Sequence, residues 1–266
     1  MEDWVRRQLI ERQQPGRQSP VMFQRWSRLL FLHWPLSPDV VQLTLPRGLQ
    51  ADTFEGNAWV GIVPFFMRGV RPAGFFSVPG ISNFLEMNLR TYVRDMCGRP
   101  GIWFYSLDAN QALAVCLARA VFALPYEFAE MSARVSLGEI DYRSRRFGSH
   151  TPLQYRYRVC EKFGEARFGS LEFFLVERYR LFARRGNKLL TGRVYHSPYQ
   201  LRKVAVTAAD PELFAIDGFR TPAEPAAHAI YSERVEVSVY PIESLASGGS
   251  STRPKEVRKS LLPGSR

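Results

Sequence analysis

The residues best placed to do chemistry in this chain lie in the segment 83–93, where polar and apolar side chains alternate strictly. Alternate side chains of an extended strand point to opposite faces. One face therefore carries a carboxylate, an amide, a guanidinium and a phenol, from Glu86, Asn88, Arg90 and Tyr92. The opposite face is apolar and carries Leu85, Met87, Leu89 and Val93.

Two interpretations of this polar face are open. The charged face of a strand ordinarily meets water, whereas the same face inside a closed sheet would line a binding pocket. In a pocket, Glu86 could act as a general acid or base if burial raised its pKa, and Arg90 could bind a carboxylate through two parallel hydrogen bonds. The two residues lie about 13 Å apart along a strand, too far to pair directly.

Arg119 is a second candidate guanidinium, because it interrupts the apolar run 112–124 and would need an acidic partner in a core. The alternative is that its side chain reaches solvent from a partly exposed helix. The four histidines lie far apart and no cysteine–histidine spacing is typical of a metal site. We therefore expect neither a metal nor a cofactor.

Short segments of period two, bounded by glycine and proline, indicate a mainly antiparallel β fold. Strands are predicted over 52–54, 58–63 and 102–107, and a hairpin joins 173–183 to 189–196 through the turn 184–188. Helices are predicted over 38–43 and 109–123, the second capped by Asp108 and buried because of its apolar composition. These elements must position the polar face of 83–93.

Composition predicts a cytoplasmic protein with one domain over residues 21–243, a flexible N-terminal arm over 1–20 and a disordered basic tail over 244–266. No apolar run is long enough to span a membrane, and the start lacks a secretory signal. The three cysteines are odd in number, so reduced, partly buried thiols are expected. Of the 36 basic residues 31 are arginine, and the net charge of +11 is concentrated at the two ends.

Several motifs occur in order and resemble the YqjF-like family of uncharacterised bacterial proteins. They are Phe-Leu-His-Trp-Pro at 31–35, Pro-Gly-Ile-Ser-Asn-Phe-Leu-Glu-Met-Asn-Leu-Arg-Thr-Tyr-Val at 79–93, Trp-Phe-Tyr-Ser-Leu-Asp at 103–108 and Leu-Pro-Tyr at 124–126. A weaker match, His-Ser-Pro-Tyr-Gln-Leu at 196–201, has Tyr199 where tryptophan is usual and adds His196 to the candidate ligand-binding residues. The resemblance runs from about residue 22 to residue 242.

This family is grouped by fold with acetoacetate decarboxylase, so the resemblance implies an α+β fold that is predominantly antiparallel β, a barrel- or cone-shaped sheet with a few packed helices. It places the decarboxylase's pocket glutamate at Glu86. Tyr126 and Glu127 stand where the decarboxylase has two lysines, the first of which forms a Schiff base with the substrate. A phenol and a carboxylate cannot form an iminium, so the chain is not expected to be a Schiff-base decarboxylase.

Our preferred hypothesis is a pocket for a small carboxylate or carbonyl compound, used for binding or for lysine-free acid–base chemistry. Its candidate ligand-binding residues are Glu86, Asn88, Arg90, Tyr92, Arg119, Tyr126 and His196, of which Glu86 and Tyr126 are the candidates for catalysis. The alternative is nucleic-acid or acidic-partner binding by the arginines and rings of 143–147 and 155–158, which is less favoured because such strands ordinarily pack their rings against neighbours. A structural role in a homo-oligomer is the third hypothesis.

Overall fold

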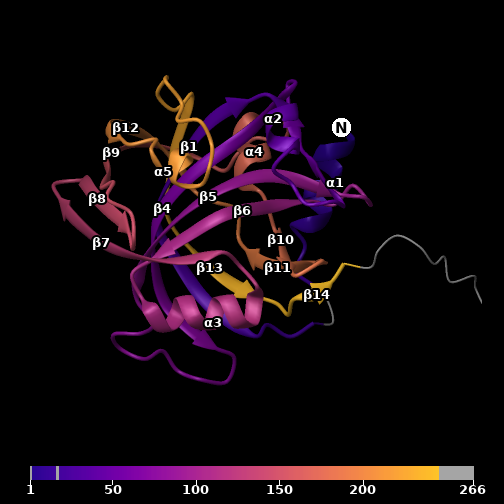
Figure 1. Cartoon of the computed structure of the whole chain (residues 1–266), viewed down its shortest axis with the longest axis horizontal. Coiled ribbons are helices and arrows are strands. Elements are labelled where there is room, and N and C mark those ends of the chain that lie inside the picture. Colours follow the sequence, from indigo (N-terminus) through magenta and orange to yellow (C-terminus); the bar gives the residue numbers. More distant parts are fainter. Residues whose placement is uncertain (1, 16–17, 246–266) are drawn as a thin grey trace, which may run out of the picture.

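Strands make up about half of the residues that the structure describes, as the period-two pattern predicts, and they join in one 14-stranded sheet. The computed structural model describes residues 2–15 and 18–245 (Figure 1). The strands are β1 (Met22–Leu36), β2 (Leu49–Ala51), β3 (Thr53–Phe54), β4 (Asn57–Pro72), β5 (Phe84–Asp95), β6 (Pro100–Ala109), β7 (Tyr126–Ser136), β8 (Glu139–Arg146), β9 (Leu153–Gly164), β10 (Arg180–Arg185), β11 (Lys188–His196), β12 (Leu201–Ala209), β13 (His228–Val239) and β14 (Glu243–Ser244). The helices are α1 (Asp3–Glu11), α2 (Pro38–Gln42), α3 (Ala112–Phe122), α4 (Leu171–Val176) and α5 (Leu213–Ile216).

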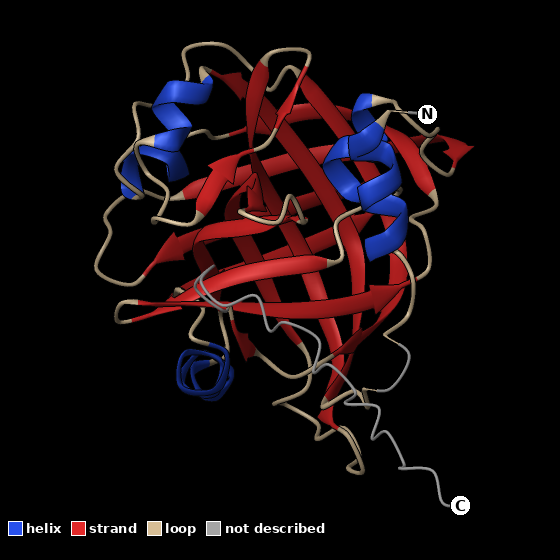
Figure 2. Cartoon of the chain, turned by 90° about the vertical axis from the view of Figure 1, so that its right-hand side faces the viewer, coloured by secondary structure: helices blue, strands red, loops and turns tan. Residues whose placement is uncertain are grey.

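The sheet closes into two rings that share a wall. In the first ring, β1 pairs with β4, β4 with β5, β5 with β6, β6 with β10, β10 with β11, β11 with β13, and β13 with β1. The second ring leaves β6 through β7, β8, β9 and β12 and returns to β13. The shared wall therefore consists of β13, β1, β4, β5 and β6. Figure 2 shows the strands crossing one another as the sheet curls round on itself.

Each ring encloses its own hydrophobic core, because the side chains of the shared wall alternate between the two interiors. In β1, Phe31 belongs to the core of the first ring, whereas Leu30 and Leu32 belong to the core of the second. In β5, Tyr92 packs in the first core and Met87 in the second. Both faces of β5 are thus buried, and its polar face does not meet bulk water.

Helix α1 replaces the flexible arm expected over residues 1–20. Gln8 is buried and its Nε2 donates to the carbonyl oxygens of Phe173, Phe174 and Glu177 at 3.1–3.3 Å. Glu11 accepts two hydrogen bonds from the Arg180 guanidinium at 3.0 and 3.1 Å. A polar sequence therefore docks through a few buried hydrogen bonds, which composition did not reveal. Of the expected tail, residues 246–266 lie outside the described residues.

Most of the other predicted elements are confirmed, but one predicted strand is only partly correct and one predicted helix cap is wrong. The strands over 52–54, 58–63 and 102–107, the helix near 38–43 and the turn at 184–188 are confirmed. The predicted strand over 173–183 is only partly correct, because residues 173–176 belong to helix α4, with Ser170 accepting from the Phe173 amide as its N-cap, and the strand β10 begins at Arg180. Asp108 does not cap α3, because β6 continues to Ala109 and the Asp108 carboxylate instead pairs with Arg146 at 2.8 Å. Gln111 caps α3 in its place.

Candidate functional site

The polar face of β5 lines the interior of the first ring. Hydrogen-bonded registers with β4 and β6 hold Glu86 beside Phe65 and Ala109, and hold Asn88 beside Val63 and Leu107. Glu86, Asn88, Arg90 and Tyr92 are all buried. The sheet therefore places a carboxyl, an amide and a guanidinium in a row within an otherwise apolar interior.

Glu86 and Tyr126 meet at one end of this row. Tyr126 opens β7, which runs parallel to β6, and its hydroxyl donates to Glu86 Oε2 at 2.9 Å. Burial raises the pKa of Glu86 to about 8, although the hydrogen bond from Tyr126 acts in the opposite direction. Burial, reinforced by the neighbouring Glu86, raises the pKa of Tyr126 well above its usual value. At neutral pH the Glu86 carboxyl is thus a protonated acid that can donate as well as accept.

Arg90 lies toward the other end of the row without a carboxylate partner. In the part of the chain that the structure describes, no acidic side chain lies within ion-pairing distance of its guanidinium, and its buried Nε has no hydrogen-bond acceptor. The guanidinium carbon lies 5.4 Å from the ring centre of Phe31 and 5.7 Å from that of Tyr92. Aromatic faces stabilise a buried cation in part, but they leave its N–H donors unsatisfied.

A chain of hydrogen bonds leads from Arg90 toward the surface. Arg90 Nη2 donates to the Tyr92 hydroxyl at 3.4 Å, and that hydroxyl lies 2.8 Å from His33 Nε2. His33 Nδ1 lies 3.0 Å from Nδ1 of His228, whose Nε2 is 3.8 Å from a carboxylate oxygen of Glu172. Burial lowers the pKa of His33 well below its usual value, helped by His228 and Arg90. His33 is therefore a neutral imidazole that accepts at one nitrogen and donates at the other.

Two further polar atoms in this interior lack partners. Asn88 Oδ1 and Trp59 Nε1 are buried and make no hydrogen bond with the described residues. Trp59 belongs to the same core as Phe31 and Tyr92. Buried polar atoms are satisfied in the large majority of native proteins. An unpartnered acceptor at Asn88 and unpartnered donors at Trp59 and Arg90 therefore mark this interior as unusual.

His196 also reaches the first ring, from the end of β11. Its ring stacks on Tyr179 at 4.5 Å between centres and lies 4.7 Å from Tyr199. Burial lowers the pKa of His196 to about 4, while its hydrogen bond with the Ser197 carbonyl opposes the shift. Like His33, it is neutral at physiological pH and adds no second cation beside Arg90.

Arg119 does not join this group. It projects from α3 toward the start of β7, where its Nε donates to the Tyr126 carbonyl at 2.5 Å and the Nη2 of its half-exposed side chain pairs with Glu127 at 2.8 Å. The solvent-reaching alternative for this side chain is therefore the observed one. Conversely, His33 contacts Tyr92 beside Arg90, His228 contacts His33, and Tyr199 packs on Phe31, yet none of the three was among the candidates. His33 stands in the motif at 31–35, which was the available signal.

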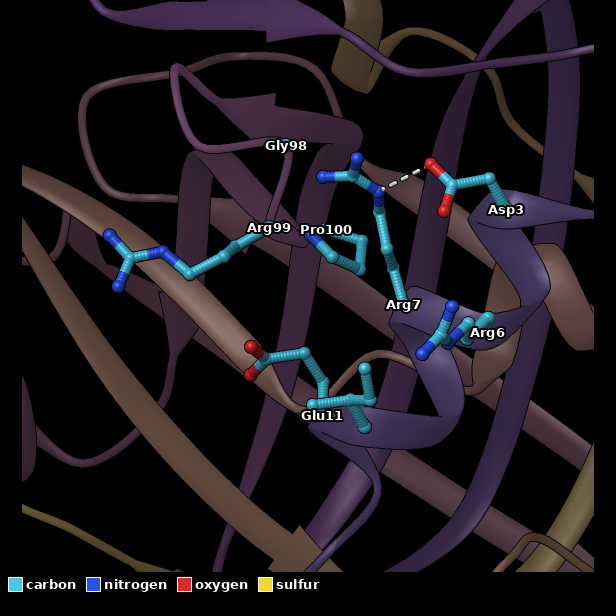
Figure 3. Close-up of a pocket in the computed structure, with 8 residues that line it drawn as sticks. Asp3, Arg6, Arg7, Glu11, Gly98, Arg99 and Pro100 are labelled. Carbon is cyan, nitrogen blue, oxygen red and sulfur yellow. Dashed lines mark hydrogen bonds and ion pairs between the residues drawn. The ribbon is translucent and has the colours of Figure 1, made fainter.

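Two cavities of the described chain lie away from this row. One, of about 290 Å³, lies between α1 and the β5–β6 turn (Figure 3) and is lined by Asp3, Arg6, Arg7, Ile10, Glu11, Gly98, Arg99 and Pro100. The other, of about 310 Å³, lies beside it and shares Arg99. Neither includes a side chain of the β5 row.

Within 2–15 and 18–245, no group of three histidine, cysteine or acidic residues could hold a metal ion. No helix of these residues is long and apolar enough to cross a membrane.

The candidate nucleic-acid platform over 143–147 and 155–158 is exposed only in part, since Phe147 is 78% exposed. The rings of Tyr155 and Tyr157 are fully buried in the core of the second ring, so they cannot stack on bases. The alternating arginines point outward and pair with acids of neighbouring strands, as Arg145 does with Glu130 and Arg156 with Asp141. In the segment 155–158, strand alternation therefore separates the buried rings from the outward arginines.

Comparisons with known proteins identify the family of this chain. Residues 23–236 match the model of the family DUF2071, described as an uncharacterized conserved protein. The chain is 34% identical over 224 residues to the uncharacterized protein YqjF of Bacillus subtilis (strain 168), which covers 84% of this chain and 91% of YqjF.

Solved structures with the same fold are more distant in sequence. The enduracididine biosynthesis enzyme MppR, complexed with pyruvate, is similar with a TM-score of 0.59 at 14% identity, over 87% of this chain and 93% of MppR. An acetoacetate decarboxylase from Legionella pneumophila has a TM-score of 0.59 at 11% identity, over 88% of this chain and 91% of its own. These likenesses confirm the predicted acetoacetate decarboxylase-like fold.

Proposed function

Since the chain belongs to the DUF2071 family of uncharacterized conserved proteins and has an acetoacetate decarboxylase-like fold, we propose that the interior of its first ring binds a small carboxylate. The observation that carries the proposal is the buried Arg90 guanidinium without a counter-ion. A buried cation is costly unless it is paired. A ligand carboxylate would supply both the missing negative charge and acceptors for the free N–H donors.

The rest of the row supports a ligand that also bears a carbonyl group. Beyond Arg90 along the strand come the Asn88 amide and then the protonated Glu86, hydrogen-bonded to Tyr126. A protonated carboxyl can donate to a carbonyl oxygen and stabilise charge that develops there. About 13 Å of strand separates Glu86 from Arg90, so a ligand that touches both ends is longer than pyruvate. The solved structure of MppR complexed with pyruvate supports the carboxylate class.

Any chemistry at this site is lysine-free. Tyr126 takes the position of the Schiff-base lysine in our proposal, and the lysines of the described part, Lys162, Lys188 and Lys203, are all exposed. Glu86 would then move a proton, Tyr126 would hold the Glu86 carboxyl in place, and Arg90 would anchor the ligand's charge. The protein acts as a binding protein or as an acid–base enzyme without a covalent intermediate.

The binding proposal is tested by thermal unfolding with 2-, 3- and 4-oxo acids of increasing length and with matched neutral ketones. A carboxylate present at ten times its Kd should raise Tm by roughly 3–5 °C, whereas the neutral ketones should not. The shift should vanish in Arg90→Met. No shift with any acid, or an equal shift in Arg90→Met, contradicts the proposal.

Arg178→Met provides the matched control for stability. Arg178 is also buried, but its Nη1 pairs with Asp52 at 2.7 Å. Removing it leaves a buried carboxylate unpaired and should cost about 3–5 kcal/mol of unfolding free energy, measured by urea denaturation. Arg90→Met leaves no unpaired acid and should cost far less. Equal losses in the two variants would mean that Arg90 has a counter-ion and no need of a ligand.

Borohydride reduction tests the lysine-free part of the proposal. Incubation with pyruvate or acetoacetate followed by reduction should leave the protein's mass unchanged, because no neutral amine faces the interior. A stable adduct on a lysine would refute this part while leaving the carboxylate site open.

A further inference from the structure

The outward face of α3 is apolar along its whole length. Only Val115 and Phe122 of this helix are buried against the first ring. On the opposite side Leu113, Leu117 and Val121 are 47%, 54% and 56% exposed. Apolar composition predicted burial for this helix, yet the structure supplies no cover for its outer side within the described chain. A surface helix of a globular protein ordinarily presents charged and polar residues there.

The loop between β4 and β5 continues this apolar surface. Phe75 and Phe76 are 69% and 82% exposed, and Val78 and Ile81 are exposed beside them. Gln111, the N-cap of α3, donates from Nε2 to the Gly80 carbonyl at 2.7 Å and ties the loop to the start of the helix. Figure 1 shows both segments outside the sheet at the same end of the molecule. We call the surface made by Leu113, Leu117, Val121, Phe75, Phe76, Val78 and Ile81 the α3 face.

The area of the α3 face fits a stable dimer. With about 200 Å² for the full surface of a large apolar side chain, these seven residues expose roughly 750 Å². The largest apolar patch of a typical monomer is about 300–600 Å². A stable interface of standard size buries about 800 Å² on each partner. The patch is therefore larger than a monomer ordinarily tolerates and matches what one copy contributes to a dimer.

We propose that the α3 face binds the α3 face of a second copy of this chain, with the two helices antiparallel about a twofold axis. The sequence of α3 is self-complementary in that arrangement. Small residues recur at Ala112, Cys116 and Ala120, beside the larger Leu113, Leu117 and Val121. If Cys116 faces Leu117 of the partner subunit, the same symmetry sets Ala120 against the partner's Leu113, and Ala112 against the partner's Val121. Each large side chain then meets a small one, which lets the helices approach closely.

Charges around α3 are compatible with this contact, because they stay at its edges. Arg119 pairs with Glu127 on the side of the helix nearer the sheet. Arg185 donates to the carbonyl oxygens of Ala120 and Val121 at 2.9 and 3.0 Å. These two carbonyls in the last turn of α3 therefore have hydrogen-bond donors and do not need water. An apolar centre with a charged rim is the usual anatomy of a protein interface.

Sedimentation velocity of the full chain, with Leu117→Glu as the variant, tests the proposal. The wild-type protein should sediment as a dimer at micromolar concentration, and Leu117→Glu should sediment as a monomer with an unchanged far-ultraviolet circular dichroism spectrum. The matched control is Leu43→Glu, since Leu43 is also exposed but lies after α2 and away from this face. It should remain dimeric.

Cross-linking locates the axis without perturbing the apolar residues. In a Cys97→Ser, Cys160→Ser background the free, exposed Cys116 should cross-link two copies through a short bis-maleimide. A matched chain that retains Cys97 in place of Cys116 should not cross-link. A wild-type monomer, a dimer unaffected by Leu117→Glu, or monomers that bind anionic lipid vesicles through this face would each overturn the proposal.

Discussion

At the scale of single residues, the first ring buries two charges of opposite sign and treats them differently. Glu86 escapes the cost of burial by holding its proton, since burial raises its pKa to about 8. A guanidinium does not lose its proton in proteins, so Arg90 remains a cation among aromatic rings. In the free protein the carboxyl of Glu86 is therefore uncharged, whereas the guanidinium of Arg90 is a buried charge without a counter-ion. This asymmetry is why we assign the ligand's charge to Arg90 and proton transfer to Glu86.

The raised pKa of Glu86 makes stability depend on pH with a definite sign. Below about pH 4.5 the carboxyl is protonated in both the folded and the unfolded chain. As the pH rises from 4.5 toward 8, only the unfolded chain releases the proton, so the folded state loses stability. Glu86→Gln cannot ionise and should escape this loss. Its unfolding free energy relative to wild type should rise between pH 5 and pH 9 by several kcal/mol, on the order of 4.

Chemical denaturation of both proteins at pH 5, 7 and 9 measures this difference. Glu55→Gln removes an exposed glutamate and should show no such pH trend. A flat difference for Glu86→Gln would mean that the Glu86 carboxyl is already ionised at neutral pH and cannot serve as the acid.

Strand alternation identified Glu86, Asn88, Arg90 and Tyr92 as one face, and the structure brings these side chains into one interior. Alternation could not decide whether that face pointed inward, because a solvated face has the same period. It also could not find His33, which reaches Tyr92 from β1, or His228, which contacts His33 from β13. Those contacts depend on pairing between strands almost 200 residues apart, which local sequence does not encode.

At the scale of elements, turns were predicted where glycine marked them and helices were harder. The turn at 184–188 has Gly186 with φ of 58°, as its sequence indicates. The first hairpin strand was predicted over 173–183, yet residues 173–176 belong to the buried helix α4, which Ser170 caps. Tertiary burial of a short apolar run outweighs its β propensity.

The β7–β8 hairpin contains a turn residue that the backbone disfavours. Leu137 and Gly138 form its two-residue loop with φ values of 47° and 78°. Both positions require the left-handed region, in which Asn-Gly is the preferred pair. Leu137 is fully exposed, so its side chain contributes no packing. Leu137→Asn should therefore raise the unfolding free energy by roughly 0.5–1 kcal/mol.

Urea denaturation midpoints of wild type, Leu137→Asn and Gly138→Ala test this expectation together. Gly138→Ala places a Cβ where φ is positive and should destabilise the protein by about 1 kcal/mol. A Leu137→Asn variant that is less stable than wild type would show that Leu137 contributes to an interaction the turn geometry does not include.

At the scale of the whole molecule, the shared wall unites the two rings into one cooperative unit. Strand β1 pairs along most of its length with β13 on one side and with β4 on the other. Its residues 29–32 are buried in both cores alternately. The sequence predicted many short strands but not this arrangement, because one chain order of antiparallel strands is compatible with several ways of closing the sheet. Closure depends on long-range pairs such as Met22 with Val239.

Hydrogen exchange should therefore distinguish the shared wall from the outer strands. Amides of residues 29–33 can open only when both rings open, so they should exchange through global unfolding. At the tip of the β7–β8 hairpin, residues 133–136 pair only with β8, residues 139–141 pair with β7 and β9, and the side chains of Val135 and Leu137 are exposed. The tip should exchange through local opening at least roughly 100-fold faster.

Mass spectrometry of peptides from these two segments measures the ratio of their exchange rates. Low urea should accelerate exchange in 29–33 far more than in 133–141, because only global unfolding exposes a large surface. If the two segments exchanged at equal rates with equal urea dependence, the hairpin tip and the shared wall would open in the same unfolding event. The shared wall would then not be the most stable part of the fold.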